Sequence, residues 1–257
     1  MTSNPPGKCC TVGVRHEGTP SGNIIKVAEH YDVYLATPPA GRVHEGVGVL
    51  LIPDVFGIWQ NNQLIADQFA ANGYTTIIPD IFNGDPLDID IDPVVPGGYD
   101  VMGWLGKGRN GAGPHTPNEV DPVVVAAINY LKDTVGVKRL ASVGYCLGAK
   151  YVVRHFKSGI DVGYLAHPSF VEENELAAIT GPLSIAAAET DPIFTVDQRH
   201  KTEVILREAG YPYQICLFSG TSHGFASRLD ASTTAQKFAK EQAFAQAVRW
   251  FDVWLLG

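Results

Sequence analysis

The sequence predicts an α/β fold in which a largely parallel sheet carries helices on both faces. Near-continuous apolar runs such as residues 47–53 (VGVLLIP) are typical of strands buried on both faces. Longer amphipathic stretches such as residues 61–73 have apolar residues at helical spacing and end at a glycine. The two kinds of segment alternate along the chain, and this alternation favours parallel strands joined by helices. We therefore predict one domain spanning residues 1–257.

The individual elements follow in chain order. Residues 23–38 (NIIKVAEHYDVYLATP) predict two short strands near an edge of the sheet. After them, strands are predicted where apolar runs recur, and helices where apolar residues return at helical spacing. The strands are expected at residues 47–53, 74–80, 139–145, 162–168, 182–190 and 213–220, and the helices at 61–73, 123–136, 149–159, 196–210 and 233–256.

Residues 81–119 interrupt this alternation. The stretch is rich in Gly, Pro and Asp and has little regular pattern, so it is either disordered or a functional lid. Apolar residues at Val101, Met102, Trp104 and Leu105 indicate that part of it packs against the domain. We therefore predict a lid-like insertion at about 81–119 that covers a pocket.

Composition narrows the class of partner. The chain has 257 residues, 45% of them hydrophobic, and a formal net charge of −8. An acidic surface disfavours nucleic acid and anionic membranes, because both bind to basic faces. No basic-then-apolar leader opens the chain, and no run approaches the roughly 20 apolar residues of a membrane span. We expect a cytoplasmic protein, a monomer or weak homodimer, acting on a small molecule.

Four cysteines are too few for a disulfide framework in a chain of this length. Cys9 and Cys10 are adjacent, but no Cys/His pair lies at zinc-finger spacing, so we predict no metal and no other cofactor. The two thiols could oxidise, although a role without chemistry is the simpler interpretation. Cys216 lies in a predicted strand and is interpreted as a small core residue.

A glycine bracket surrounds the remaining cysteine. Residues 144–148 (GYCLG) place Cys146 between a predicted strand and a predicted helix, with a glycine two residues away on each side. The thiol is either buried beside a turn or a nucleophile on the sharp strand-to-helix bend of an α/β-hydrolase. In such a bend the glycines avoid clashes, and the following helix N-terminus favours the thiolate.

Two other strand ends favour the nucleophile. Asp191 follows the strand at 182–190, and His223 follows the strand at 213–220. The chain order of nucleophile, acid and histidine is that of α/β-hydrolases, and such strand ends meet at one edge of a parallel sheet. A neutral histidine can take the thiol proton and return it later, while a carboxylate fixes its tautomer.

The end of the strand predicted at 47–53 adds a candidate oxyanion-hole amide and a carboxylate. The backbone N–H of Val55 could pair with that of Leu147 to form an oxyanion hole. Asp54 is either a structural turn residue or a carboxylate close enough to Cys146 to tune which partner holds the proton.

Taken together, the motifs IPDVFG, GYCLGAK, ETDPIF and SHGFASR resemble those of the dienelactone hydrolase family, particularly its fungal members. The resemblance spans nearly the whole chain, including CCTVGVRHEGTPSG near the N-terminus. It implies an α/β-hydrolase fold of about eight strands, no metal, and hydrolysis of lactones or related esters through an acyl-cysteine. Carried over, Cys146 is the nucleophile, His223 the base and Asp191 the orienting acid. Asp54 falls where the bacterial enzymes have a thiol-activating glutamate.

The substrate pocket is less defined. The bacterial enzymes use two arginines for a substrate carboxylate, but the segment PDIFNGD has none at the place of the first. Arg228 lies five residues after His223, and either contacts an acidic substrate or is a surface arginine. Candidate pocket walls are Trp59, Phe82 and Trp104, together with His167, which follows a strand and is either a pocket residue or a hydrogen-bonded support for the site.

We predict a cysteine hydrolase of a small lactone, ester or thioester, in which His223 takes the proton of Cys146. A non-hydrolytic or redox-responsive binding protein on the same scaffold is an alternative, because a low-pKa thiol is easily oxidised. The presence of His223 and Asp191 argues against this alternative, because a protein that only binds does not need them. A tailoring isomerase on this fold is the third possibility.

Overall fold

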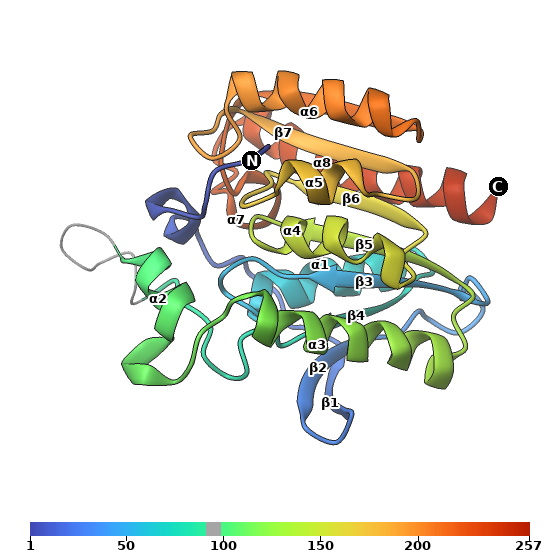
Figure 1. Ribbon diagram of the computed structural model, residues 1–257. Helices are drawn as coiled ribbons and strands as arrows, with labels where there is room; N and C mark the ends of the chain where they lie inside the picture. The colour runs from blue at the N-terminus through green and yellow to red at the C-terminus, as the bar shows by residue number, and fades with distance from the viewer. Residues whose placement is uncertain (91–98) are drawn as a thin grey trace.

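The computed structural model describes residues 1–90 and 99–257, and it confirms the predicted α/β fold. Within this part of the chain, eight strands form one sheet in the order β1-β2-β4-β3-β5-β6-β7-β8 (Figure 1). The pairs β1–β2 and β2–β4 are antiparallel, and every other pair is parallel. The strands are β1 (Asn23–Val27), β2 (Tyr31–Ala36), β3 (Val47–Ile52), β4 (Thr75–Pro79), β5 (Arg139–Tyr145), β6 (Val162–Ala166), β7 (Leu183–Thr190) and β8 (Tyr213–Ser222).

Helices cover both faces of the sheet (Figure 1). On one face α1 and α8 pack through residues such as Phe69 and Phe251, and on the other α3, α4, α5 and α6 pack through residues such as Val124 and Leu176. The α-helices are α1 (Gln60–Ala71), α2 (Val101–Lys107), α3 (Pro117–Asn129), α4 (Gly148–Arg154), α5 (Glu173–Ala177), α6 (Val196–Ala209), α7 (Phe225–Arg228) and α8 (Thr234–Phe251). The 3₁₀-helical segments are η1 (Lys8–Thr11), η3 (Arg109–Gly111) and η5 (Phe156–Ser158), and the π-helical segments η4 (Tyr130–Val135) and η6 (Asp252–Leu256) directly follow α3 and α8.

The insertion predicted at 81–119 contains α2 and η3, and its residues 91–98 lie outside the described part. Val101, Trp104 and Leu105 are buried as predicted, whereas Met102 is 45% exposed. The indole N–H of Trp104 donates to the backbone oxygen of Asp85 (3.0 Å), which joins α2 to the segment after β4. Part of the insertion is therefore packed, and its action as a lid stays a prediction.

Residues 2–14, which we call the N-terminal strap, cross the edge of the sheet where the parallel strands end. The N–H of Asn4 donates to the oxygen of Ile193 (2.8 Å), beyond β7, and the N–H of Val14 donates to the oxygen of Arg228 (3.0 Å), after β8. The middle of the strap forms η1, in which Cys10 has no exposed surface. The strap thus places the two N-terminal cysteines over the predicted site.

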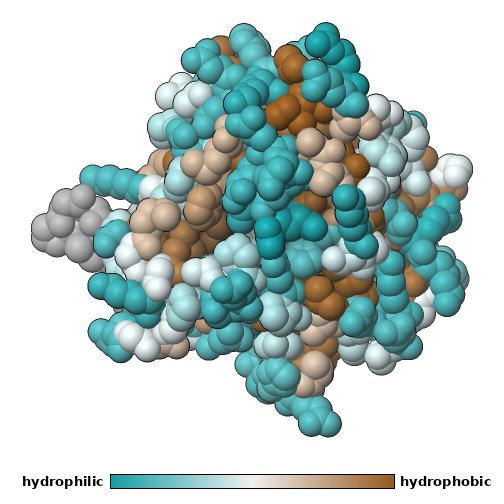
Figure 2. Space-filling view, in the orientation of Figure 1, coloured by the Kyte–Doolittle hydropathy of each residue, from teal (hydrophilic) through white to brown (hydrophobic). Residues whose placement is uncertain are grey.

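The surface in view is mainly polar. On the face shown in Figure 2 hydrophilic residues predominate, and hydrophobic residues appear as separate patches between them. Among the helices of the described residues, none combines the length and apolar character needed to span a membrane.

Candidate active site

The bend between β5 and α4 holds Cys146 in a strained conformation. Its φ is 51°, a value that non-glycine residues adopt at a cost and mostly at functional sites. A side chain at Gly144 would come within 2.6 Å of the backbone nitrogen of Ala149, and one at Gly148 would collide with the oxygen of Ile52. Both glycines of the bracket are therefore required by close backbone approach, as the sequence predicted.

The structure brings the three predicted triad residues together. The Nε2 of His223 lies 3.1 Å from the Sγ of Cys146, and its Nδ1 lies 2.9 Å from Oδ2 of Asp191. Asp191 is itself held by the N–H groups of Ile193 (2.8 Å) and Phe194 (3.1 Å), which donate to its Oδ1. The Cys–His–Asp arrangement is therefore confirmed.

The pKa shifts of Cys146 and His223 favour a proton on the imidazole rather than on the thiol. Burial acts to raise the pKa of the Cys146 thiol, but Cys10 and His223 outweigh it and the pKa lies well below its ordinary value. Burial likewise acts to lower the pKa of His223, yet the Cys146 thiolate and Asp191 raise it to about 10. These two shifts favour a thiolate–imidazolium pair before substrate binds, and removal of the thiol proton by His223 stays a prediction.

A second cysteine, Cys10, completes the site from the N-terminal strap. Its Sγ lies 3.3 Å from the Sγ of Cys146 and 3.5 Å from Nε2 of His223. Hydrogen bonds to Cys146 and Cys9, together with burial, hold the pKa of Cys10 well above its ordinary value. The raised pKa favours a protonated Cys10 thiol within hydrogen-bond distance of the Cys146 sulfur. The sequence analysis did not place Cys10 beside Cys146, and whether its thiol takes part in chemistry stays a prediction.

Asp54 does not contact the thiol. Its carboxylate accepts hydrogen bonds from Nη1 of Arg228 (2.8 Å), Nδ2 of Asn62 (3.1 Å) and Oγ of Ser227 (3.2 Å). Arg228 is 1% exposed, so the alternative of a surface arginine is wrong. The guanidinium also contributes to the lowered pKa of Cys146. Asp54 thus interacts with the thiol only electrostatically, directly and through the Arg228 that it binds, and its tuning of the thiol stays a prediction.

The candidate oxyanion donors lie on two turns that pack against each other. Within the described residues, neither the N–H of Val55 nor that of Leu147 donates a hydrogen bond to another group. The turn of Val55 is fixed by Asp54, whose Oδ1 accepts from the N–H of Phe56 (3.3 Å). The bend of Leu147 is pressed onto this turn, because Gly148 lies against the backbone oxygens of Ile52 and Pro53. The pairing of these two amides stays a prediction that this packing supports.

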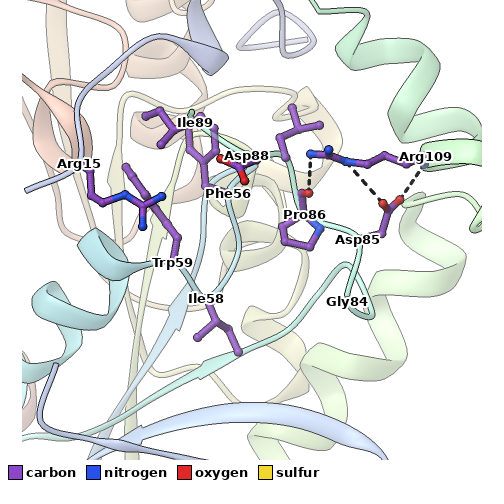
Figure 3. Close-up of a pocket in the computed structure, with 11 residues that line it drawn as sticks. Arg15, Phe56, Ile58, Trp59, Gly84, Asp85, Pro86, Asp88, Ile89 and Arg109 are labelled. Atoms are coloured by element: carbon purple, nitrogen blue, oxygen red, sulfur yellow. Dashed lines mark hydrogen bonds and ion pairs between the residues drawn. The ribbon is translucent and has the colours of Figure 1, made fainter. Parts of the chain in front are cut away.

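A cavity of about 390 Å³ borders the turn that carries Val55 (Figure 3). Trp59, a predicted pocket wall, lines it together with Phe56, whose ring centroid is 4.9 Å from that of Trp59. Arg109 closes the side formed by the insertion, where its Nη2 donates to the oxygen of Pro86 (2.8 Å). Phe56, the residue after Val55, lines this cavity, whereas His223 and Arg228 line another cavity of about 310 Å³.

Phe82 and Trp104 do not line this cavity. Both are buried, and their ring centroids lie 4.9 Å apart. His115 packs on both rings and approaches Asp85, with Nε2 2.9 Å from Oδ2. These three aromatic residues all belong to the insertion and pack its parts together in this structure, and contact of Phe82 and Trp104 with a substrate stays a prediction.

The loop after β6 carries two residues that contact the triad. His167 packs against His223, and Ser169 lies beside Cys146. The ring of His167 is fully buried and packs edge-on against that of His223, with centroids 5.0 Å apart. Within the described residues neither ring nitrogen of His167 has a hydrogen-bond partner, so it is not the hydrogen-bonded support that the sequence suggested. Ser169, which the sequence did not indicate, has its Oγ 3.5 Å from the Sγ of Cys146.

Among the described residues, the donor atoms that could hold a metal ion are those of Cys10, Cys146 and His223, which lie within 4.8 Å of one another. The hydrolytic interpretation needs the same atoms for a nucleophile and a proton. We therefore expect that dialysis against EDTA leaves kcat/KM unchanged, and that metal analysis of active protein finds no stoichiometric metal. A loss of activity that added Zn²⁺ restores would contradict this expectation.

Comparison with known proteins agrees with this geometry. The sequence model of the Dienelactone hydrolase family matches residues 31–255 of the chain. The chain is 44% identical over 257 residues to hydrolase pyvD of Aspergillus violaceofuscus, covering 99% of both chains. It is 31% identical over 258 residues to Dienlactone hydrolase 1 of Gibberella moniliformis, covering 99% of this chain and 96% of the relative.

Solved structures show the same fold at low sequence identity. A putative dienelactone hydrolase from Klebsiella pneumoniae superposes with a TM-score of 0.68 at 16% identity, covering 90% of this chain and 97% of the other. A dienelactone hydrolase-like phosphotriesterase, P91, superposes with a TM-score of 0.67 at 14% identity, covering 91% and 98%. At these identities the likeness supports the fold alone.

Proposed function

Since the chain belongs to the dienelactone hydrolase family and is a hydrolase of the ester and lactone class, we propose that it cleaves its substrate through an acyl-cysteine on Cys146. The observation that carries the proposal is the continuous contact from Cys146 through His223 to Asp191, at 3.1 and 2.9 Å. The non-hydrolytic binding protein and the isomerase are not favoured, because the relatives are hydrolases.

In the proposed reaction the Cys146 thiolate attacks the substrate carbonyl carbon, and the C=O electron pair moves to oxygen. The N–H groups of Leu147 and Val55 donate to this oxyanion. When the carbonyl re-forms, the C–O or C–S bond of the leaving group breaks and the group takes the proton from Nε2 of His223. His223 then removes a proton from water, whose oxygen attacks the acyl carbon and releases the acid and the thiolate.

The substrate proposed is a small lactone, ester or thioester. The net charge of −8 and the four free thiols support a cytoplasmic enzyme that binds neither nucleic acid nor membrane. We also propose that it exists as a monomer or weak homodimer. Arg228 is the candidate contact for an acidic group. Its charge is already matched by Asp54 at 2.8 Å, so we propose it as an aid to binding rather than as a requirement.

The test is to trap the intermediate. Mixing the protein with a slowly hydrolysed aryl ester and quenching in acid should give one acyl group per chain, and peptide mapping should place it on Cys146. Matched lactones with and without a carboxylate, assayed on the same protein, will report how much an acidic group adds to kcat/KM. Full turnover by Cys146→Ala, or an adduct confined to another residue, would refute the mechanism.

A further inference from the structure

We propose that Cys10 is a resolving thiol for Cys146, so that hydrogen peroxide converts the pair into a disulfide that reversibly stops hydrolysis. The two sulfur atoms lie 3.3 Å apart, and both residues are fully buried. They are 136 positions apart in the chain and meet only because the N-terminal strap crosses the edge of the sheet. Hydrolysis needs only the thiol of Cys146, so it does not explain why the thiol of Cys10 lies beside it.

The contact is close to bonding geometry. A disulfide bond is about 2.05 Å long, so the sulfur atoms must approach by roughly 1.2 Å. Cys146 is held by the tight bend between Gly144 and Gly148, whereas Cys10 lies on a four-residue turn in a strap tied at its ends. Bond formation therefore requires a small shift of the strap and leaves the bend in place.

The site supplies the reactive form for the first step. The Cys146 thiolate attacks one oxygen of hydrogen peroxide, an S–O bond forms, and the O–O bond breaks. The departing hydroxide takes the proton of the His223 imidazolium and leaves as water. Cys146 is then a sulfenic acid, and His223 is neutral. Peroxide is close to water in size, so it can reach a thiolate that the strap shields from larger oxidants.

The same histidine serves the second step. Nε2 of His223 lies 3.5 Å from the Sγ of Cys10 and can remove its proton. The Cys10 sulfur then attacks the sulfenic sulfur, the S–S bond forms, and the S–O bond breaks. The hydroxide leaves with the proton from His223 as a second water. Without Cys10, the sulfenic acid persists and is oxidised further to the irreversible sulfinic acid.

The chain offers a matched control in the neighbouring residue. Cys9 is half-buried, and the hydrogen bond from Cys10 lowers its pKa to about 7 against the opposing effect of burial. Because Cys9 is a second thiol one position from Cys10, its replacement shows whether any thiol on the strap can form the disulfide. Trypsin leaves both residues in the peptide 9–15 and Cys146 in the peptide 140–150, so Cys9→Ser also assigns the cross-link.

The experiment exposes the full chain to hydrogen peroxide, blocks free thiols with N-ethylmaleimide, and maps the non-reduced peptides. Wild type and Cys9→Ser should both link peptides 9–15 and 140–150. The linked mass should be lower by two hydrogens than the sum of the separate peptides, and in wild type it should carry one added N-ethylmaleimide on Cys9. Dithiothreitol should restore most of each protein's starting turnover. Cys10→Ser should show no link, gain a sulfinic acid on Cys146, and stay inactive after dithiothreitol.

Two outcomes would overturn the proposal: loss of the link in Cys9→Ser while Cys10→Ser keeps it, or equal recovery of Cys10→Ser and wild type after dithiothreitol. The peptide map of the wild-type protein decides the matter even if Cys10→Ser fails to fold, because an oxidised wild type without the link refutes it. The map is read without any substrate, so it stands apart from the proposed hydrolytic mechanism.

Discussion

Replacing His223 with Ala is expected to lower kcat/KM by roughly 10⁴-fold or more. The imidazolium stabilises the Cys146 thiolate across 3.1 Å and supplies the proton for the leaving group, so the variant loses both the nucleophile and the acid. His200→Ala is the matched control, since His200 is exposed on α6 and far in the sequence from the triad. Steady-state kinetics on one aryl ester compares the three proteins, and a loss below tenfold in His223→Ala would contradict the assignment.

The pH dependence gives this prediction an independent readout. The pKa of His223 is raised to about 10, so the imidazolium persists through neutral pH and is lost as the pH rises through that value. The pKa of Cys146 is lowered, so its thiolate is lost only well below the ordinary thiol range. We expect wild-type kcat/KM to be flat around neutral pH and to fall above about pH 10. The thiolate absorbance of Cys146 in His223→Ala is measured as the difference between this variant and His223→Ala/Cys146→Ser. It should appear only at a higher pH than the Cys146 thiolate of the wild-type protein.

The order of the elements and the triad could be predicted because each rests on a local pattern. Apolar runs and helical spacing identify the parallel strands, and in such a sheet the ends of β5, β7 and β8 meet at one edge. Cys146, Asp191 and His223 directly follow those strands, so their proximity follows from the fold. The glycines at 144 and 148 carry a second local signal, since the bend leaves no room for side chains.

The contacts that could not be predicted join segments with no periodic pattern. Cys10 reaches Cys146 through the N-terminal strap, whose path depends on single hydrogen bonds such as that from Asn4 to Ile193. Asp54 follows β3 and Arg228 ends α7, 174 positions later, and either side chain could have faced solvent or the thiol. The adjacent pair Cys9 and Cys10 was the sequence feature that could have indicated this contact. The segment around the pair resembles the family, but no pattern in the nearby residues identifies Cys146 as the group that Cys10 contacts.

Replacing Arg228 with Met is expected to lower the free energy of unfolding by about 3–5 kcal/mol at neutral pH. Asp54 has no exposed surface, and the variant leaves its carboxylate with hydrogen bonds from neutral groups but no counter-charge. Arg15→Met is the matched control, since it removes an exposed partner of Asp90 and should change stability by no more than about 1 kcal/mol. Urea unfolding followed by circular dichroism measures both variants.

The pH dependence and a double variant separate lost charge from lost packing, because Arg228 also lies over the ring of Phe56, 5.7 Å from its centroid. Burial already raises the pKa of Asp54 while Arg228 opposes it, so removing Arg228 raises that pKa further. A carboxyl whose pKa is higher in the folded than in the unfolded state destabilises the fold as the pH rises through the folded value. The loss in Arg228→Met should therefore shrink at low pH. Asp54→Asn/Arg228→Met, which buries neither charge, should regain most of the lost stability. If the double variant is no more stable than Arg228→Met, the loss comes from packing on Phe56 and the ion pair is not what stabilises this part of the site.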